Sequence, residues 1–157
     1  MHGIARLALV LLFATVSSAC ASTRARVEDP VASADALDQR FVEAFNRGDA
    51  EGVAACYARG PDVFLQPPHP GLVKGWDAIR EHYRQMFSAM SGLHLSLSDH
   101  VNGPVGDVVI GVGAWHLTFG ASGEPRSAMH GMFFDVKGVR DGKWVYLADC
   151  AVVPMQE

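Results

Sequence analysis

Apolar residues recur at helical spacing in the first patterned segment of the chain. Leu37, Phe41 and Phe45 lie four positions apart, so they share one face of a helix. Asp35 can cap the first turn of this helix, and Gly48 can end it in a left-handed conformation. The pattern therefore predicts a helix that begins near Asp35 and buries an aromatic face.

Two further helices are predicted by the same kind of spacing. Asp49 can cap a short second helix, in which Val53, Cys56 and Tyr57 share a face. The third, residues 76–90, has the clearest pattern, because charged residues separate its apolar positions. Those apolar positions are Ile79, Tyr83, Met86, Phe87 and Met90. Their stripe needs a sheet to cover it.

Segments with strand patterns make up most of the remaining chain. Residues 62–66 form a short apolar run, and prolines occupy three of the next four positions, where they cannot continue a ladder of backbone hydrogen bonds. Residues 93–101 alternate apolar and polar side chains. Three longer strand-like runs follow at 107–119, 128–137 and 143–153.

Short turns connect these later runs, which favours antiparallel pairing. Gly111 and Gly113 predict a bend in one of the strands. The sequence therefore predicts an α+β fold, in which three helices lie on one face of a curved antiparallel sheet that encloses a cavity.

The first residues have the features of an export signal. Arg6 precedes a short apolar run, residues 7–16, that is too short to span a bilayer permanently. Cys20 follows small residues, which resembles the bacterial lipoprotein signal, in which this cysteine is lipidated and becomes the mature N-terminus. Ordinary cleavage after Ala21 is the alternative, because Ala19 and Ala21 fit the small-x-small rule.

These features divide the chain into three parts. Residues 1–20 are predicted to be a signal peptide of the lipoprotein type, residues 21–34 a flexible tether, and residues 35–157 the folded domain. The protein is expected to be exported, as a periplasmic or membrane-anchored lipoprotein or, after ordinary cleavage, as a secreted protein. Contact with the membrane is expected only through a lipid at Cys20.

Composition and residue spacing exclude some classes of partner. The chain has 13 basic and 17 acidic residues, a formal net charge of −4 and no cluster of Lys or Arg, so nucleic acid is not an expected partner. The sequence has no spacing typical of a metal site, and no cofactor is expected. Cys56 and Cys150 can form a disulfide between the second helix and the last strand, or remain separate thiols. A small, largely uncharged molecule is the expected partner.

Three segments together resemble a known family. The runs from Gln39 to Asp49, from Gly75 to Arg80 and from Gly142 to Asp149 are similar, in order and spacing, to the nuclear transport factor 2-like superfamily. Within it, the SnoaL-like and ketosteroid-isomerase-like bacterial proteins are the most similar branches. The resemblance implies a cone of three N-terminal helices packed on a strongly bent antiparallel β-sheet that encloses an apolar pocket. It also implies that the domain is often a homodimer packed through the outer faces of the sheets. Activities vary widely across this superfamily, so the resemblance does not assign one.

The catalytic groups of the steroid isomerases are absent from the matching positions. Phe41 stands where those enzymes have a tyrosine that helps to hold the developing enolate oxygen, and Leu65 or Gln66 stands where they have an aspartate base. None of these side chains can exchange a proton at neutral pH. Tyr83 matches a tyrosine of the family's pocket. Whether the chain is an enzyme is therefore left open, but its chemistry is not that of the steroid isomerases.

Asp149 is the strongest candidate for chemistry. It interrupts an apolar strand, where a carboxylate needs a partner, water or a ligand to offset its desolvation. His130 or His116, from other strands, can supply an imidazole across the sheet, and such a pair is a credible acid–base couple. Each residue also has a structural alternative, since Asp149 can pair with an Arg and the histidines can be ordinary sheet residues.

These residues leave three functions open. The first is binding of a small apolar molecule in the pocket, with contacts from Phe41, Gln66, Tyr83, Phe87 and His116. The second is an acid–base enzyme (an isomerase, cyclase or hydrolase) in which Asp149 acts with His130 or His116. The third is an interaction or assembly module of the cell envelope that uses its exposed sheet.

Overall fold

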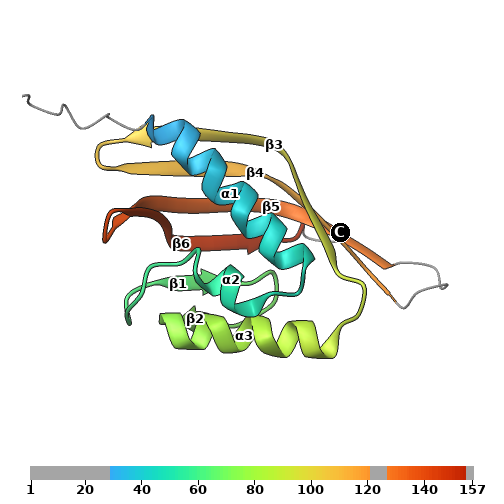
Figure 1. The fold of residues 1–157 in the computed structure, drawn as a ribbon. Coiled ribbons are helices and arrows are strands. Elements are labelled where there is room, and N and C mark those ends of the chain that lie inside the picture. The colour runs from blue at the N-terminus through green and yellow to red at the C-terminus, as the bar shows by residue number, and fades with distance from the viewer. Residues whose placement is uncertain (1–28, 121–126, 155–157) are drawn as a thin grey trace, which may run out of the picture.

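Three helices cover one face of a curved six-stranded sheet (Figure 1). The computed structural model describes residues 29–120 and 127–154. The helices are α1 (Pro30–Asn46), α2 (Ala50–Ala54) and α3 (Trp76–Ala89). The strands are β1 (Phe64–Gln66), β2 (Val73–Lys74), β3 (His94–Val105), β4 (Val108–Phe119), β5 (Ser127–Arg140) and β6 (Lys143–Val152). The predicted α+β fold is confirmed.

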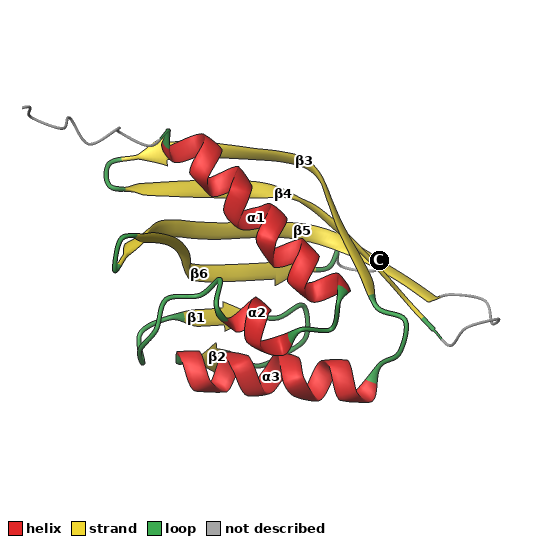
Figure 2. Cartoon of the chain, viewed as in Figure 1, coloured by secondary structure: helices red, strands yellow, loops and turns green. Residues whose placement is uncertain are grey.

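The strands lie in the order β2-β1-β6-β5-β4-β3. All neighbours pair antiparallel except β1 and β6, which run parallel. The four long strands form one continuous curved surface, and α1 crosses its concave face (Figure 2). The inward side chains of the sheet and the apolar faces of α1 and α3 share one core, which includes Leu37, Phe41, Phe45, Tyr57, Ile79, Tyr83, Trp115, Phe133 and Tyr146.

Helix α1 begins five residues before the predicted start at Asp35. Asp29 caps it by accepting hydrogen bonds from the backbone amides of Val31 and Ala32, and Pro30 takes the first helical position. The apolar stripe starts only with the buried Ala34, so periodicity alone gave no sign of the first turn. Residues 30–34 therefore belong to the helix and not to the predicted tether.

The predicted signal peptide and lipidation site lie outside the described residues and stay predictions. Among the residues that the structure describes, none of the helices is both long and apolar enough to cross a membrane.

Helix α2 ends at Ala54, earlier than its apolar spacing predicted, because the next residues join the sheet. The backbone of Tyr57 forms a parallel bridge with Tyr146 on β6. Ala58 N donates to Tyr146 O at 2.9 Å, and Tyr146 N donates to Cys56 O at 2.8 Å. This bridge fixes the side chain of Tyr57 against β6, where the candidate site lies.

The two cysteines predicted as either a disulfide or separate thiols are both free. Cys56 is buried among the helices, where its Sγ contacts Gly52 O at 3.5 Å. Cys150 lies on β6 in register with Phe134, on the face of the sheet that points away from the helices. The sheet separates the two sulfurs.

Gly111 allows a close approach of side chains. A Cβ atom at this position would lie 2.5 Å from both Asp135 Oδ1 and Lys137 Nζ. Any larger residue would push these groups apart. The absence of a side chain at Gly111 therefore leaves room for a buried group of polar side chains next to β4.

Candidate functional site

A cavity of about 130 Å³ lies between the helices and the concave face of the sheet. Most of its wall is apolar, and five side chains with polar groups interrupt it: His82, Tyr83, Asp135, Tyr146 and Asp149. The apolar lining consists of Phe41, Phe45, Leu65, Pro67, Pro68, Met86, Leu95, Leu97, Trp115, Leu117, Phe133 and Ala151. Concave, mostly apolar sites with a few convergent polar groups are typical of small-molecule pockets.

Asp149 is held at the cavity wall by a chain of two tyrosines. The Tyr57 hydroxyl donates to Asp149 Oδ2 at 2.6 Å and lies 3.0 Å from the Tyr83 hydroxyl. Because Tyr57 has only one hydroxyl proton, its oxygen accepts from Tyr83 while that proton points to Asp149. The three groups thus form a directed chain that ends on the carboxylate.

Burial raises the pKa of Asp149 to about 7. The Tyr57 hydrogen bond works in the other direction, and the nearby charge of Asp135 adds to the increase. Burial also raises the pKa of Tyr57 and of Tyr83, so both hydroxyls stay neutral. Asp149 can therefore exist in both protonation states near neutral pH, as a general acid or base requires.

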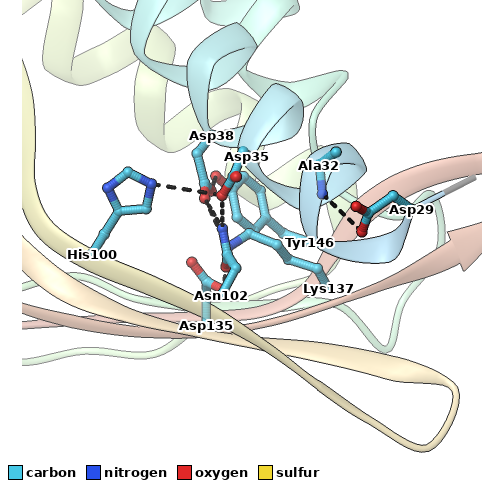
Figure 3. A network of polar contacts seen from close by, with 9 residues as sticks. All are labelled: Asp29, Ala32, Asp35, Asp38, His100, Asn102, Asp135, Lys137 and Tyr146. Carbon is cyan, nitrogen blue, oxygen red and sulfur yellow. Dashed lines mark hydrogen bonds and ion pairs between the residues drawn. The ribbon is translucent and has the colours of Figure 1, made fainter.

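A second polar cluster lies deeper, between α1 and the sheet (Figure 3). We call it the Lys137 cluster; its members are Asp38, Asn102, Asp135, Lys137 and Tyr146. Lys137 is fully buried, and its Nζ lies 3.0 Å from Asp38 Oδ2, 2.8 Å from Asn102 Oδ1 and 2.7 Å from Asp135 Oδ1. Tyr146 donates to Asp38 Oδ1 at 2.5 Å. One buried ammonium group thus forms ion pairs with two carboxylates.

The Lys137 cluster reaches the surface on one side and the cavity on the other. Asn102 Nδ2 donates to Asp38 and to the exposed Asp35, beside which His100 lies at 3.7 Å. At the opposite end, Asp135 and Tyr146 line the cavity. The pKa of Asp135 is raised to about 6 by burial, although Lys137 lowers it.

Asp35, Asp38 and His100 bring their ligand atoms within 4.8 Å of one another. Asp38 is already neutralised by Lys137 and accepts from Tyr146. A cation placed among these three residues would meet the buried ammonium of Lys137, so the group is a poor metal site.

Of the five predicted ligand-binding residues, two line the cavity, and Gln66, Phe87 and His116 do not. Phe41 and Tyr83 line the cavity. Phe87 packs on the rings of Phe45 and Tyr83 but is not part of the lining. The amide of Gln66 donates to the carbonyl oxygens of residues 67, 69 and 71, so it holds the proline-rich turn and does not face a ligand.

The predicted pairing of Asp149 with His130 or His116 does not form. The two histidines are directly opposite each other on β5 and β4, exposed, with ring centroids 5.9 Å apart. Trp115 and Leu117 line the cavity, so His116 between them points to the other face of the sheet. Strand alternation therefore places both histidines on the outer face.

The sequence did contain a signal for the residues that were missed. Phe133, Asp135 and Lys137 are two positions apart and therefore share a face, as do Asp149 and Ala151. Asp38 likewise follows the buried Leu37 on the inner side of α1. Because Phe133 is an obvious core residue, the same alternation carries Asp135 and Lys137 into the interior.

His82 was also missed, on the helix whose pattern was clearest. It lines the cavity next to Tyr83, and its ring lies 5.8 Å from that of His69. Burial, followed by the charge of His69, lowers the pKa of His82. With Pro68 and Met86 it is only half-buried, so this part of the wall reaches the surface.

The family comparison agrees with this architecture. The model of the SnoaL-like domain matches residues 39–147, and the chain belongs to this family of the nuclear transport factor 2-like superfamily. No functionally curated protein shows significant sequence similarity to the chain.

Solved structures show the same fold at low sequence identity. A nuclear transport factor 2-like protein from Streptomyces avermitilis, provisionally named a dehydratase, has 15% identity and a TM-score of 0.73, with 81% of this chain and 98% of that chain covered. A Novosphingobium aromaticivorans protein, provisionally named a scytalone dehydratase, has 15% identity and a TM-score of 0.69, with 79% and 83% covered. Another protein from that organism, with a cystatin-like fold, has 15% identity and a TM-score of 0.71, with 82% and 84% covered.

Proposed function

We propose that the domain binds a small, mostly apolar molecule in its cavity and that Asp149 transfers a proton to or from it. The observation that carries this proposal is a carboxyl group with a pKa of about 7 in the wall of an apolar cavity, joined to Tyr83 through Tyr57. A titratable group tuned to the working pH is what general acid–base catalysis needs.

The cavity volume limits the ligand. An apolar cavity of about 150 Å³ holds one benzene ring, and this cavity has about 130 Å³. A single ring fits it as it stands. A larger molecule must displace the half-buried side chains at the cavity's exposed side, near His82 and Pro68.

The polar groups suggest how a ligand is oriented. Tyr83 can turn its hydroxyl proton from Tyr57 to a ligand oxygen, while Asp149 faces a different atom of the same molecule. Two of the solved structures carry dehydratase names, and loss of water from a hydroxy carbonyl compound is one reaction that needs such proton transfers. A dehydration or an isomerisation is therefore the reaction class to test first.

Ligand binding can be tested with a panel of phenols, cyclic ketones and linear fatty acids. We expect the single-ring compounds to raise the melting temperature and to change the fluorescence of Trp115, which lies in the cavity wall. Replacing Ala151 by Phe fills the cavity and should abolish both effects.

Ala148→Phe is the matched control, because Ala148 lies on the same strand but its side chain points to the outer face. Failure of every compound class to stabilise the wild-type protein would refute the binding proposal.

We further propose that the outer face of the sheet packs against a second copy of the chain. Phe64, Val112, Met132, Phe134 and Val152 are exposed there, with Phe134 47% exposed, and we call them the outer-face patch. Register pairs Val112 with Phe134 and Met132 with Val152, so the patch is continuous across three strands. Since none of its members is charged, two copies can meet about a two-fold axis without like-charge repulsion.

Phe134→Lys should therefore dissociate a homodimer, because it places a charge at the centre of this interface. Sedimentation equilibrium at micromolar concentration should show a dimer for the wild-type chain and a monomer for the variant. Val105→Lys, an equally drastic change at an exposed position away from the patch, should leave the dimer intact. A wild-type chain that is monomeric at every concentration would contradict the proposal.

A further inference from the structure

Two carboxylates face each other across the strands that form the polar side of the cavity. Asp135 on β5 and Asp149 on β6 are direct partners in the antiparallel register, and both line the cavity. Side chains of such partners lie on the same face, with Cβ atoms about 5 Å apart. Like charges in this position repel each other, so the pair requires compensation.

The compensation available to this pair is incomplete. Lys137 is shared between Asp38 and Asp135, while Asp149 accepts a hydrogen bond from the neutral hydroxyl of Tyr57. The three carboxylates Asp38, Asp135 and Asp149 thus face one buried cation. If all three were ionised, two negative charges would stay uncompensated in an apolar interior, which is strongly unfavourable.

Asp135 also has capacity to accept a proton. Its Oδ1 is 2.7 Å from Lys137 Nζ, and this ion pair lowers the pKa of Asp135, but burial outweighs it and raises that pKa to about 6. The residue is only 2% exposed, so bulk solvent does little to stabilise its charged form. Asp135 can therefore take up a proton near neutral pH, as Asp149 can.

We infer that Asp135 and Asp149 form a proton-sharing pair, in which one carboxyl group donates to the ligand while the other accepts from it. This inference rests on the proposed function and names a second residue for its chemistry. Lys137 and Gly111 act as positioning residues, since the first pairs with Asp135 and the second leaves room for both groups.

The pair would work as acid and base in one step. The protonated carboxyl group gives its proton to a ligand oxygen, and the charged one takes a proton from a ligand carbon. The ligand gains one proton and loses one, so its net charge does not change. A proton then returns from the second carboxyl group to the first, which restores the starting state.

Other titratable groups lie around Asp135 and Asp149, but they are less suited to share a proton with Asp149. They are Asp38 from α1, Tyr57 before β1, His82 and Tyr83 from α3, Lys137 from β5 and Tyr146 from β6. The hydroxyls of Tyr57, Tyr83 and Tyr146 keep their protons, because burial raises their pKa values. Asp135 is therefore the neighbour of Asp149 best suited to share its proton.

The test is a carboxyl ¹³C NMR titration of the purified full chain without ligand. In the wild-type protein, the signals of Asp135 and Asp149 should each show the same two midpoints, because each responds to the ionisation of the other. In Asp135→Asn, Asp149 should show a single midpoint that is lower by about one pH unit, because a neighbouring negative charge is gone.

Asp141→Asn is the matched control, since it removes one charge from the exposed turn of the same β-hairpin. Single, unrelated midpoints in the wild-type protein, or an unchanged Asp149 midpoint in Asp135→Asn, would overturn the inference. If Asp135→Asn does not fold, the wild-type titration alone decides. Because no ligand is present, this result is independent of the ligand panel that tests the proposed function.

Discussion

Replacing Asp149 by Asn should make the protein more stable above neutral pH and at the same time abolish its proton-transfer activity. The pKa of Asp149 is raised to about 7 in the folded protein, so the unfolded chain releases this proton at a lower pH. Between the two pKa values, the free energy of unfolding falls as pH rises, and this loss is complete above about pH 7. Asparagine has the shape of the neutral acid and avoids this loss.

The expected gain at pH 8 is up to about 4 kcal/mol, and it should disappear near pH 4, where both side chains are neutral in the folded protein. Urea unfolding at both pH values measures it without knowledge of the substrate. With a substrate found in the ligand panel, turnover should fall about 10²–10⁴-fold, as for loss of a general acid or base.

Asp141→Asn, in an exposed turn, should show no pH-dependent gain. A variant of Asp149 that is less stable than the wild-type protein at both pH values would mean that the carboxylate stabilises the fold, and the catalytic proposal would lose its basis.

Replacing Lys137 by Met should destabilise the protein by about 3–5 kcal/mol, because it removes one partner from a buried ion cluster. Lys137 is fully buried, and its ammonium group contacts Asp38, Asp135 and Asn102. Methionine fills much of the space but leaves two carboxylates without a cation. Urea unfolding at pH 7 measures the loss.

Two further variants separate the charge effect from a packing effect. Lys143→Met, at an exposed position, should change stability little. Adding Asp135→Asn to Lys137→Met should recover part of the loss, because it removes one of the unpaired carboxylates. A Lys137→Met protein as stable as the wild type would show that the cluster contributes no net stability.

The helices and strands could be predicted largely from spacing. The apolar stripe of α3 and the alternation in β3 arise because each element buries one face. The spacing of apolar residues in the sequence indicates which face that is. The start of α1 could not be found in this way, since Asp29 and Pro30 act through backbone geometry rather than through burial.

The site was predicted only in part, because pairing across a sheet depends on register. Asp149 stood out as a charge in an apolar strand. Its partner could not be chosen from the sequence. His130 and Asp135 lie on the adjacent strand β5 and His116 lies one strand further, and a register shift of one residue would exchange the face on which each side chain lies. Tyr57 was assigned to a helix, so its hydroxyl was not expected at β6.

The bridge between Tyr57 and Tyr146 has a consequence for motion in the domain. Tyr57, Tyr146 and Asp149 are all fixed to β6, by the chain itself or by backbone hydrogen bonds. Displacement of α3 would carry Tyr83 and His82 away while the hydroxyl of Tyr57 stays on the carboxylate. The polar end of the cavity can therefore keep its shape while the helical wall opens. Ligand entry then depends on movement of α3, whereas proton transfer depends on the groups held by β6.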